Sequence, residues 1–485
     1  MNFNSLQYLV FLVANVVVYY LLPQRARNVQ LLLASYYFYM CWNPTYALLM
    51  LFSTAVTYGC GLLVGASAWG KRRLWVALSL ILNLGVLFFF KYYNFTADVI
   101  TRGMDFLGLS IDVPFLDVLL PVGISFYTFQ ALGYTIDVYR GDVQAQRNFI
   151  DYALFISFFP QLVAGPIERS GNMIHQLKER HPFQFENIKA GILPVLWGLF
   201  KKMVIADNLA VVVNTVYNNP QGQGGGAFLV ATVAFAFQIY CDFSAYSDIA
   251  RGSARMLGFR LMENFNGPYF SKSIREFWRR WHISLSSWFK DYLYFPLGGS
   301  RRGKARTCLN VMIVFFVSGL WHGAALTFVA WGLLNGLYQV VSLLVDPLRK
   351  RVMALLHLRD ESLLVRGFRL CCTFFLTCMA WVLFRANSLT DALAAYRAIF
   401  SIPFAGGDGT LTALGVSVKT LGMLFLFVAV LVLVDWLLTR MPLFQKLNKT
   451  VFLRYGVYFL LIVSILLFGS YGQGYDPQDF VYFQF

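Results

Sequence analysis

Residues 307–345 read TCLNVMIVFFVSGLWHGAALTFVAWGLLNGLYQVVSLLV and contain no Asp, Glu, Lys or Arg. A membrane-spanning helix needs about 20 apolar residues, so this stretch is long enough for two helices that cross a bilayer as a hairpin. Residues 28–70 are uncharged in the same way. Two such stretches in one chain indicate a polytopic membrane protein. They exclude a soluble enzyme, a secreted disulfide scaffold and a disordered chain.

The composition of the whole chain agrees with this interpretation. Of its 485 residues 58% are apolar and 13% are charged, whereas a soluble domain carries about 25% charged residues. The 40 Lys and Arg outnumber the 24 Asp and Glu, which gives a net charge of +16. An excess of this size can mark a nucleic-acid-binding protein, but cytoplasmic loops of membrane proteins are also rich in Lys and Arg. We therefore expect a lipid bilayer, and no nucleic acid, as the partner of these charges.

The sequence shows no pattern for a metal or a nucleotide cofactor. Most of the seven cysteines lie in apolar runs and none forms a CxxC pair, so they are expected to be small buried hydrophobic residues. No HxxxH spacing and no phosphate-binding glycine loop is present. We predict no metal site and no cofactor.

Basic loops give the apolar segments a direction across the membrane. Residues 6–22 precede Arg25 and Arg27. By the positive-inside rule this places the N-terminus outside. The basic residues follow the apolar run, whereas in a signal peptide they precede it. Residues 29–69 are predicted to form a hairpin that turns at Asn43-Pro44. Residues 91–118 are expected to form an external loop or a re-entrant piece.

The remaining apolar segments complete the count. Residues 149–166 have basic residues on both sides and are predicted to be re-entrant, which requires burial within the protein. The others lie at 74–90, 119–139, 188–206, 227–250, 307–345, 370–384, 412–438 and 455–470. The sequence thus predicts an all-α bundle of about 11 spanning or re-entrant helices in one membrane domain, 1–470. A C-terminal tail, 471–485, is expected on the outer, extracytoplasmic side of the membrane.

His322 is the residue of the uncharged hairpin that points most clearly to chemistry. Ionisable groups at membrane depth are costly and usually face a cavity or a partner, and Gly319 and Gly323 beside it allow a broken helix or a close backbone approach. An imidazole with a pKa of about 6.5 can take a proton from a hydroxyl group at neutral pH. The alternative is a histidine that is hydrogen-bonded to a neighbouring helix.

A second histidine, His282, lies in the basic segment 272–306, which we place in the cytoplasm. Taken as one helix, this part of the chain has large apolar side chains on one face (Trp278, Trp281, Leu285 and Trp288) and polar ones on a neighbouring stripe (Arg275, Arg279 and His282). The pattern predicts an amphipathic helix at a membrane interface. Its cations either anchor to lipid phosphates or steer an anionic ligand towards the protein.

Two carboxylates and three amides in the apolar segments are further candidates for a structural or a cavity-lining role. Asp242 and Asp248 lie in an apolar helix, and we expect them to be structural, paired with Arg251, Arg255 or helix-end dipoles, rather than a proton relay. Asn310, Asn335 and Gln339 either line a cavity or tie helices together.

Two strings, NFNGPYFSKSIREFWRRWHISLSSWFKDYLYFPLGG from residue 264 and SGLWHGAALTFVAWG from residue 318, resemble the membrane-bound O-acyltransferase (MBOAT) family. The similarity is greatest to its bacterial alginate O-acetyltransferase branch and spans most of the chain. The resemblance implies a helical bundle around a tunnel that joins the cytoplasm to the outer face of the bacterial inner membrane. In that family pattern His322 is the catalytic histidine and His282 the second characteristic histidine.

The resemblance also implies the reaction and its participants. The acyl donor is acetyl-CoA, a substrate rather than a cofactor, and the acceptor is a cell-surface or exported polysaccharide, alginate first, reached with a periplasmic SGNH-type acetyltransferase partner. Arg275, Arg279, Trp278 and Asn310 are expected to contribute to donor binding. Tyr482 in the terminal QDFVYFQF is a candidate acyl carrier, as in related acyl-transfer systems, unless these aromatic residues form an interfacial belt.

Two other functions remain open at this point. The same fold could transfer D-alanine or another acyl group to a cell-wall polymer, and the charge pattern does not exclude it. A small-molecule transporter without chemistry would place its ionisable residues at a binding site in the middle of the membrane, often between repeats. No internal repeat is evident in the sequence, which argues against the transporter.

Overall fold

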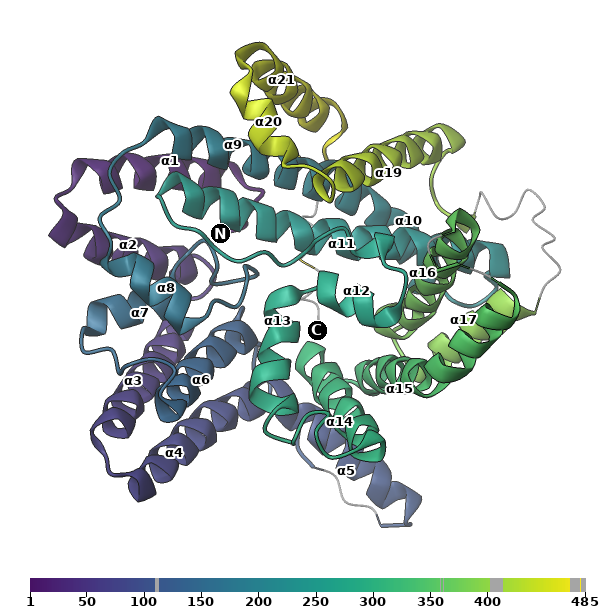
Figure 1. The fold of residues 1–485 in the computed structure, drawn as a ribbon, viewed down its shortest axis with the longest axis horizontal. Helices are drawn as coiled ribbons and strands as arrows, with labels where there is room; N and C mark the ends of the chain where they lie inside the picture. Colours follow the sequence, from purple (N-terminus) through teal and green to yellow (C-terminus); the bar gives the residue numbers. More distant parts are fainter. Residues whose placement is uncertain (110–112, 358, 361, 402–412, 472–479, 481–485) are drawn as a thin grey trace. The chain divides into compact units, whose positions relative to one another are not determined.

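The computed structural model describes residues 1–109, 113–357, 359–360, 362–401, 413–471 and 480. Every secondary-structure element in these ranges is a helix (Figure 1), which confirms the all-α prediction. By length and composition, eight of the described helical segments can cross a membrane: Pro44–Ala66, Gly70–Phe106, Gly225–Met256, Lys304–His322, Leu326–Leu355, Leu363–Arg385, Val418–Leu438 and Val451–Phe468. The shorter Leu6–Leu21 is also apolar.

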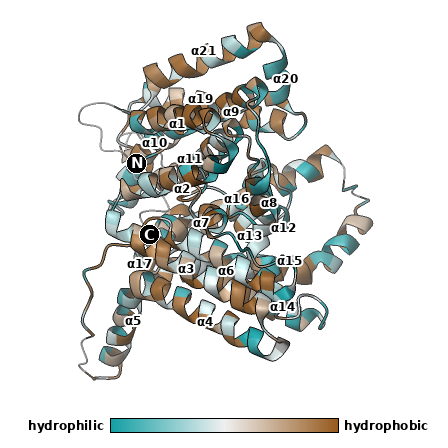
Figure 2. Ribbon diagram, turned by 90° about the vertical axis from the view of Figure 1, so that its left-hand side faces the viewer, coloured by the Kyte–Doolittle hydropathy of each residue, from teal (hydrophilic) through white to brown (hydrophobic). Residues whose placement is uncertain are grey.

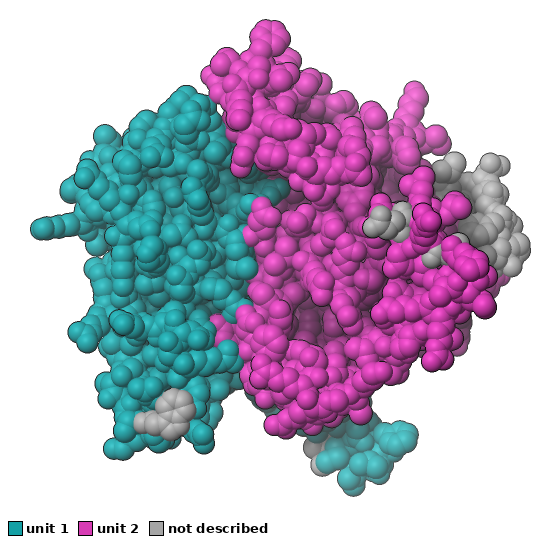
Figure 3. Space-filling model, in the orientation of Figure 1, with its two compact units in different colours: residues 1–195, 246–262 teal, residues 196–245, 263–485 magenta. Residues whose placement is uncertain are grey.

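The chain packs as two compact units, coloured teal and magenta in Figure 3. Unit 1 comprises residues 1–195 and 246–262. Its helices are α1 (Leu6–Leu21), α2 (Gln24–Met40), α3 (Pro44–Ala66), α4 (Trp69–Leu87), η1 (Phe88–Tyr92), α5 (Tyr93–Phe106), α6 (Ile124–Arg140), α7 (Phe149–Ser157), α8 (Ser170–Lys178), most of α9 (Phe185–Leu199) and the end of α11 (Gly225–Met256).

Unit 1 confirms one turn of the predicted topology, agrees in length with a re-entrant segment and revises the prediction for residues 91–118. Asn43 caps α3 by accepting a hydrogen bond from the backbone of Thr45, so the first hairpin turns where Asn43-Pro44 predicts. Helix α7 has nine residues and is about 14 Å long, too short to cross a hydrocarbon core of about 30 Å, as expected for a re-entrant segment. Residues 93–106, however, continue the preceding helix as α5 instead of forming a loop.

Unit 2 comprises residues 196–245 and 263–485 and holds both candidate histidines. After the end of α9 and the first part of α11, its helices are η2 (Phe200–Ala206), α10 (Asp207–Tyr217), η3 (Pro268–Phe270), α12 (Ile274–Arg280), α13 (Ile283–Phe289), η4 (Lys290–Tyr294), α14 (Lys304–His322), α15 (Leu326–Leu355), α16 (Leu363–Arg385), α17 (Leu389–Phe400), α19 (Val418–Leu438), α20 (Leu443–Lys449) and α21 (Val451–Phe468). Helix α17 lies in a segment for which the hydropathy pattern predicts no helix.

The uncharged stretch 307–345 forms the predicted hairpin, with α14 and α15 side by side. Small residues set the spacing between these two helices. A Cβ atom on Gly319 would lie 2.4 Å from the carbonyl oxygen of Phe328, and one on Gly332 would lie 2.3 Å from that of Phe315. The two backbones are therefore as close as glycine allows, and this contact fixes the end of α14 against the start of α15.

The C-terminal helices of unit 2 present apolar side chains outward. In Figure 2, α21 is apolar along most of its length, whereas α20 next to it is hydrophilic. On α21, Phe452 is 90% exposed and Leu467 69% exposed. A contiguous apolar surface of this kind is unfavourable in water and favourable in lipid, in agreement with a multi-pass membrane protein.

Candidate active site

His322 is the last residue of α14 and is enclosed by aromatic rings. Its side chain is buried, and its ring centroid lies 4.9 Å from that of Trp331, 5.0 Å from Trp321 and 5.6 Å from Phe384. The helix ends here because the backbone of Gly323 becomes extended. The prediction of a helix break and a close backbone approach around His322 is therefore confirmed.

His282 lies between α12 and α13, and this corrects the sequence analysis, which expected one continuous amphipathic helix. The backbone of His282 has φ 43° and ψ 56°, a left-handed conformation that is rare for residues with a side chain. Asn264 holds the turn, since its carbonyl and side-chain oxygens accept hydrogen bonds from the backbone N–H groups of Ile283 and Ser284. The break turns His282 into the protein, where it is 1% exposed.

The left-handed turn brings the two histidines together. Their ring centroids are 6.5 Å apart, and the ring of Trp321 lies next to both. Phe243 covers His282 edge-on at 4.6 Å. Burial lowers the pKa of His282 to about 3, so this imidazole is neutral at pH 7. It can orient a reactant through a hydrogen bond without adding a charge.

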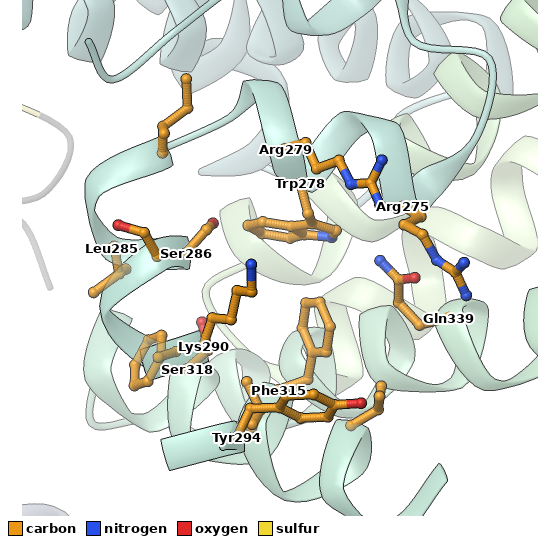
Figure 4. A pocket seen from close by; sticks show the side chains of 15 residues that line it. Arg275, Trp278, Arg279, Leu285, Ser286, Lys290, Tyr294, Phe315, Ser318 and Gln339 are labelled. Carbon is orange, nitrogen blue, oxygen red and sulfur yellow. The ribbon is translucent and has the colours of Figure 1, made fainter. Parts of the chain in front are cut away.

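A cavity of ≈ 370 Å³ in unit 2 (Figure 4) is lined by Ile283, the residue after His282, and by Ser318, four residues before His322. Figure 3 shows the face of unit 2 hollowed in the area where Figure 1 places α12, α13 and α14. The cavity is lined from five elements: Arg275, Trp278 and Arg279 of α12; Ile283, Leu285, Ser286, Ser287 and Phe289 of α13; Lys290 and Tyr294 of η4; Val311, Val314, Phe315 and Ser318 of α14; and Gln339 of α15.

The charged side chains of this cavity are all cationic. Arg275, Arg279 and Lys290 line it, and none of the lining residues, all within the described part of unit 2, is acidic. In Figure 4 the amine of Lys290 points towards the indole of Trp278. Apolar walls with a few cations suit an anionic ligand that also has an apolar part. The structure thus brings Arg275, Trp278 and Arg279, all predicted from the sequence, to one cavity.

The cavity approaches His322 but is not lined by it. Ser318 lies four residues before His322 and so on the same face of α14. On the other side, the ring of Trp278 is 5.7 Å from that of Trp331, which in turn contacts His322. A pair of indole rings therefore connects the cavity to the histidine.

The three amides considered in the sequence analysis lie at different places. Asn310 is fully buried, and its amide donates hydrogen bonds to the carbonyl groups of Leu297 and Gly299; it is not among the lining residues. Asn335 accepts a hydrogen bond from the Trp278 indole at 3.3 Å, and Gln339 lines the cavity. Asn310 thus stays a prediction for donor binding.

The candidate carrier Tyr482 lies outside the described residues. Phe480, two positions earlier in the sequence, is described: it is 1% exposed, and its ring centroid lies 5.7 Å from that of Phe243. Phe243 is the residue that covers His282. Phe480, two residues before Tyr482, is thus buried against Phe243, and Phe243 in turn contacts His282.

A buried ion cluster behind Phe243 was not predicted as such. Lys202 of η2 forms ion pairs with Asp207 at 2.9 Å and with Asp242 at 2.8 Å, and all three side chains are buried. Asp242 is thus paired, as expected for a structural carboxylate, but with a lysine that the prediction did not name; Asp248 contacts Arg251 at 3.9 Å, as predicted. Within the described ranges, no three His, Cys, Asp or Glu side chains come together as a metal site requires.

Replacing Gly323 by alanine is expected to destabilise the site. Its Cβ would lie 2.2 Å from a ring carbon of Phe328, and that ring packs against Phe384 at 4.9 Å. Overpacking of this kind costs about 1–3 kcal/mol, which should lower the melting temperature of the purified protein. Gly422→Ala is the matched control, because a Cβ there meets nothing within 4 Å. Equal melting temperatures for the two variants would contradict the close packing described here.

The amino-acid sequence of this chain is similar to those of known membrane proteins. Residues 143–384 match the sequence model of MBOAT, the membrane-bound O-acyltransferase family. A protein named "Probable alginate O-acetylase AlgI" from Pseudomonas syringae is 42% identical over 82% of this chain and 73% of its own length. One of the same name from Pseudomonas putida is 39% identical over 96% of both chains. A "Peptidoglycan O-acetyltransferase" from Helicobacter pylori is 34% identical over 79% of this chain and 76% of its own length.

Proposed function

Because the chain belongs to the membrane-bound O-acyltransferase family, we propose that it moves acetyl groups from cytoplasmic acetyl-CoA through the inner membrane for the O-acetylation of a cell-surface or exported polysaccharide. The chain is a multi-pass membrane O-acyltransferase. The names of the relatives support a polysaccharide acceptor, with alginate as the first choice. A periplasmic SGNH-type acetyltransferase receives the acetyl group, and both chain termini lie on its side of the membrane.

The observation that carries the proposal is a cationic cavity one helical turn from a buried histidine. Coenzyme A is a polyanion with a long, largely uncharged arm that ends in the thioester. Arg275, Arg279 and Lys290 offer three positive charges to its phosphates. The same cavity is lined by Trp278 and Ser318, and in this proposal the arm runs past them to bring the thioester to His322. Trp278 has to move aside for the thioester to pass.

The chemistry at His322 is acyl transfer with general-base catalysis. His322 accepts the proton of the attacking hydroxyl group, whose oxygen forms a bond to the acetyl carbonyl carbon. The carbon–sulfur bond then breaks, and the proton passes from His322 to the departing sulfur, which leaves as the thiol of CoA. His282, neutral and 6.5 Å away between ring centroids, orients the donor. The surrounding rings exclude the water that would otherwise hydrolyse the thioester.

The attacking hydroxyl group in this proposal is the phenol of Tyr482, so that transfer occurs in two steps. The first step yields acetyl-tyrosine and free CoA. In the second step a hydroxyl group of the partner or the polysaccharide takes the acetyl group and restores the phenol. The burial of Phe480 against Phe243 supports this assignment, because it anchors the chain two residues before Tyr482 beside the ring that covers His282.

Reversing the charge of two cavity arginines tests the donor site. The double variant Arg275→Glu/Arg279→Glu should raise the KM for acetyl-CoA about tenfold or more, since each charged hydrogen bond contributes about 1.5–3 kcal/mol and 1.4 kcal/mol is a tenfold change in affinity. The kcat should change little, because neither arginine contacts His322. The measurement is the rate of CoA release from acetyl-CoA by the purified protein in lipid vesicles with an acceptor present.

The matched control for this test is Arg301→Glu/Arg302→Glu. It makes the same change in net charge at two exposed arginines outside the cavity lining. A rise in the KM that is the same in both double variants would show a general electrostatic effect and contradict a donor site in the cavity. An unchanged KM in Arg275→Glu/Arg279→Glu would contradict it as well.

A further inference from the structure

His322 faces a wall of rigid rings that leaves little room for an acyl group. Trp331 and Phe384 form this wall: their centroids lie 4.9 Å and 5.6 Å from that of His322 and 5.2 Å from each other. Both side chains are 1% exposed. They come from α15 and α16, so two different helices close the space on one side of the histidine.

A second layer of rings holds this wall in place. Trp381 stacks on Trp331 at 6.0 Å with an interplanar angle of 16°, and it meets Phe384 edge-on at 5.3 Å. Phe328 packs edge-on against Phe384 at 4.9 Å. Close-packed interiors of this kind yield little when a larger group is inserted. The wall therefore cannot retreat to accept an extra carbon atom.

We infer that Phe384 and Trp331 set the length of the acyl group that His322 transfers, and that they limit it to two carbons. This inference rests on the proposed function, because it takes His322 as the site of acyl transfer. The carbonyl carbon has to lie next to His322 during the reaction, so the remainder of the acyl group projects against the surrounding rings. In this proposal an acetyl group is the longest acyl group accommodated between His322 and these rings, and a longer chain meets Phe384. Phe384 contacts the reacting group in this arrangement and determines the specificity of the reaction.

The expected preference of the unaltered protein is large. One extra methylene in a tight apolar pocket changes kcat/KM by about 10–200-fold. The unaltered protein should therefore use acetyl-CoA at least about tenfold better than propionyl-CoA. The preference should be mainly in kcat, because the cations that bind CoA lie in the cavity and contact the same groups of both donors.

The test compares Phe384→Leu with Phe235→Leu. Phe235 is 1% exposed, and its ring packs on both Phe384 and Trp381 at 6.3 Å, but it has no ring contact with His322 among the described residues. Both variants lose the same volume from one aromatic cluster, and only Phe384→Leu opens space beside the histidine. Phe384→Leu should reduce the acetyl-to-propionyl ratio of kcat/KM about tenfold. Phe235→Leu should leave the ratio within about twofold.

The ratio is measured as the release of CoA from each donor by the same preparation in lipid vesicles with an acceptor. A loss of folded protein lowers both rates equally and does not change the ratio. An unchanged ratio in Phe384→Leu, an equal fall in both variants, or no preference in the unaltered protein would each overturn the inference. If the unaltered protein released no CoA from acetyl-CoA, the proposed function itself would be wrong. That outcome differs from an active protein in which Phe384→Leu leaves the ratio unchanged, which would contradict only the present inference.

Discussion

The variant His322→Ala is expected to lose acetyl transfer by about 10³-fold, within the range that positioned acid–base groups contribute. The side chain lies at the end of α14 among rings that exclude water, so no solvent molecule is well placed to replace it. The KM for acetyl-CoA should change little, because His322 is not part of the cavity lining. The loss should therefore appear in kcat, measured as CoA release in lipid vesicles.

A histidine on the surface of unit 1 serves as the control for this variant. His175 is exposed, and its Nδ1 atom lies 3.1 Å from a carboxylate oxygen of Glu179; His175→Ala should retain full activity. Removing a buried imidazole could also loosen the fold, so the melting temperatures of both variants are compared with that of the unaltered protein. A general base contributes much more than a factor of ten to the rate. If His322→Ala stayed folded and kept more than about a tenth of the activity, His322 would not be the catalytic base. A transporter without chemistry would release no CoA in any variant.

Tyr482→Phe is expected to abolish acetylation of the polysaccharide in cells, although it removes only one oxygen atom. If the phenol carries the acetyl group, phenylalanine has no nucleophile to accept it. If the terminal aromatic residues instead form an interfacial belt, phenylalanine serves that purpose equally well and acetylation stays complete. The measurement is the acetyl content of the exported polysaccharide by mass spectrometry, at equal amounts of protein in the membrane.

Tyr471→Phe is the matched control, since it removes the phenol of an exposed tyrosine near the same end of the chain. Its hydroxyl group donates a hydrogen bond to the carbonyl of Leu466, a contact within one helix end, and its loss should leave acetylation unchanged. A second measurement addresses the intermediate itself: the peptide that contains Tyr482 should carry an acetyl group when the partner is absent. Complete acetylation by Tyr482→Phe would show that the acetyl group takes another route.

Features of the fold and of the candidate site could be predicted from the sequence wherever a local property of the chain decides them. The uncharged stretch 307–345 predicts a hairpin, because the cost of a charge in a membrane depends on each residue alone. Gly319 and Gly323 predict a close approach and a helix end beside His322, because a residue without Cβ permits both. The cations Arg275 and Arg279 share one helix face and so predict one common surface.

Other features depend on residues that are distant in the chain, and only the tertiary structure decides them. His282 occupies a left-handed turn, and this turn is held by hydrogen bonds from Ile283 and Ser284 to Asn264, almost 20 residues earlier in the chain. The wall at His322 joins Trp331 to Phe384, and the buried partner of Asp242 is Lys202. The sequence by itself therefore determined the class of protein, the hairpin 307–345 and the two candidate histidines, since these follow from local hydrophobicity, charge and recognisable motifs. Which rings surround the histidines, and which cation neutralises Asp242, was decided by packing between helices, where shape and the need to neutralise buried charge select among many partners of equal local propensity.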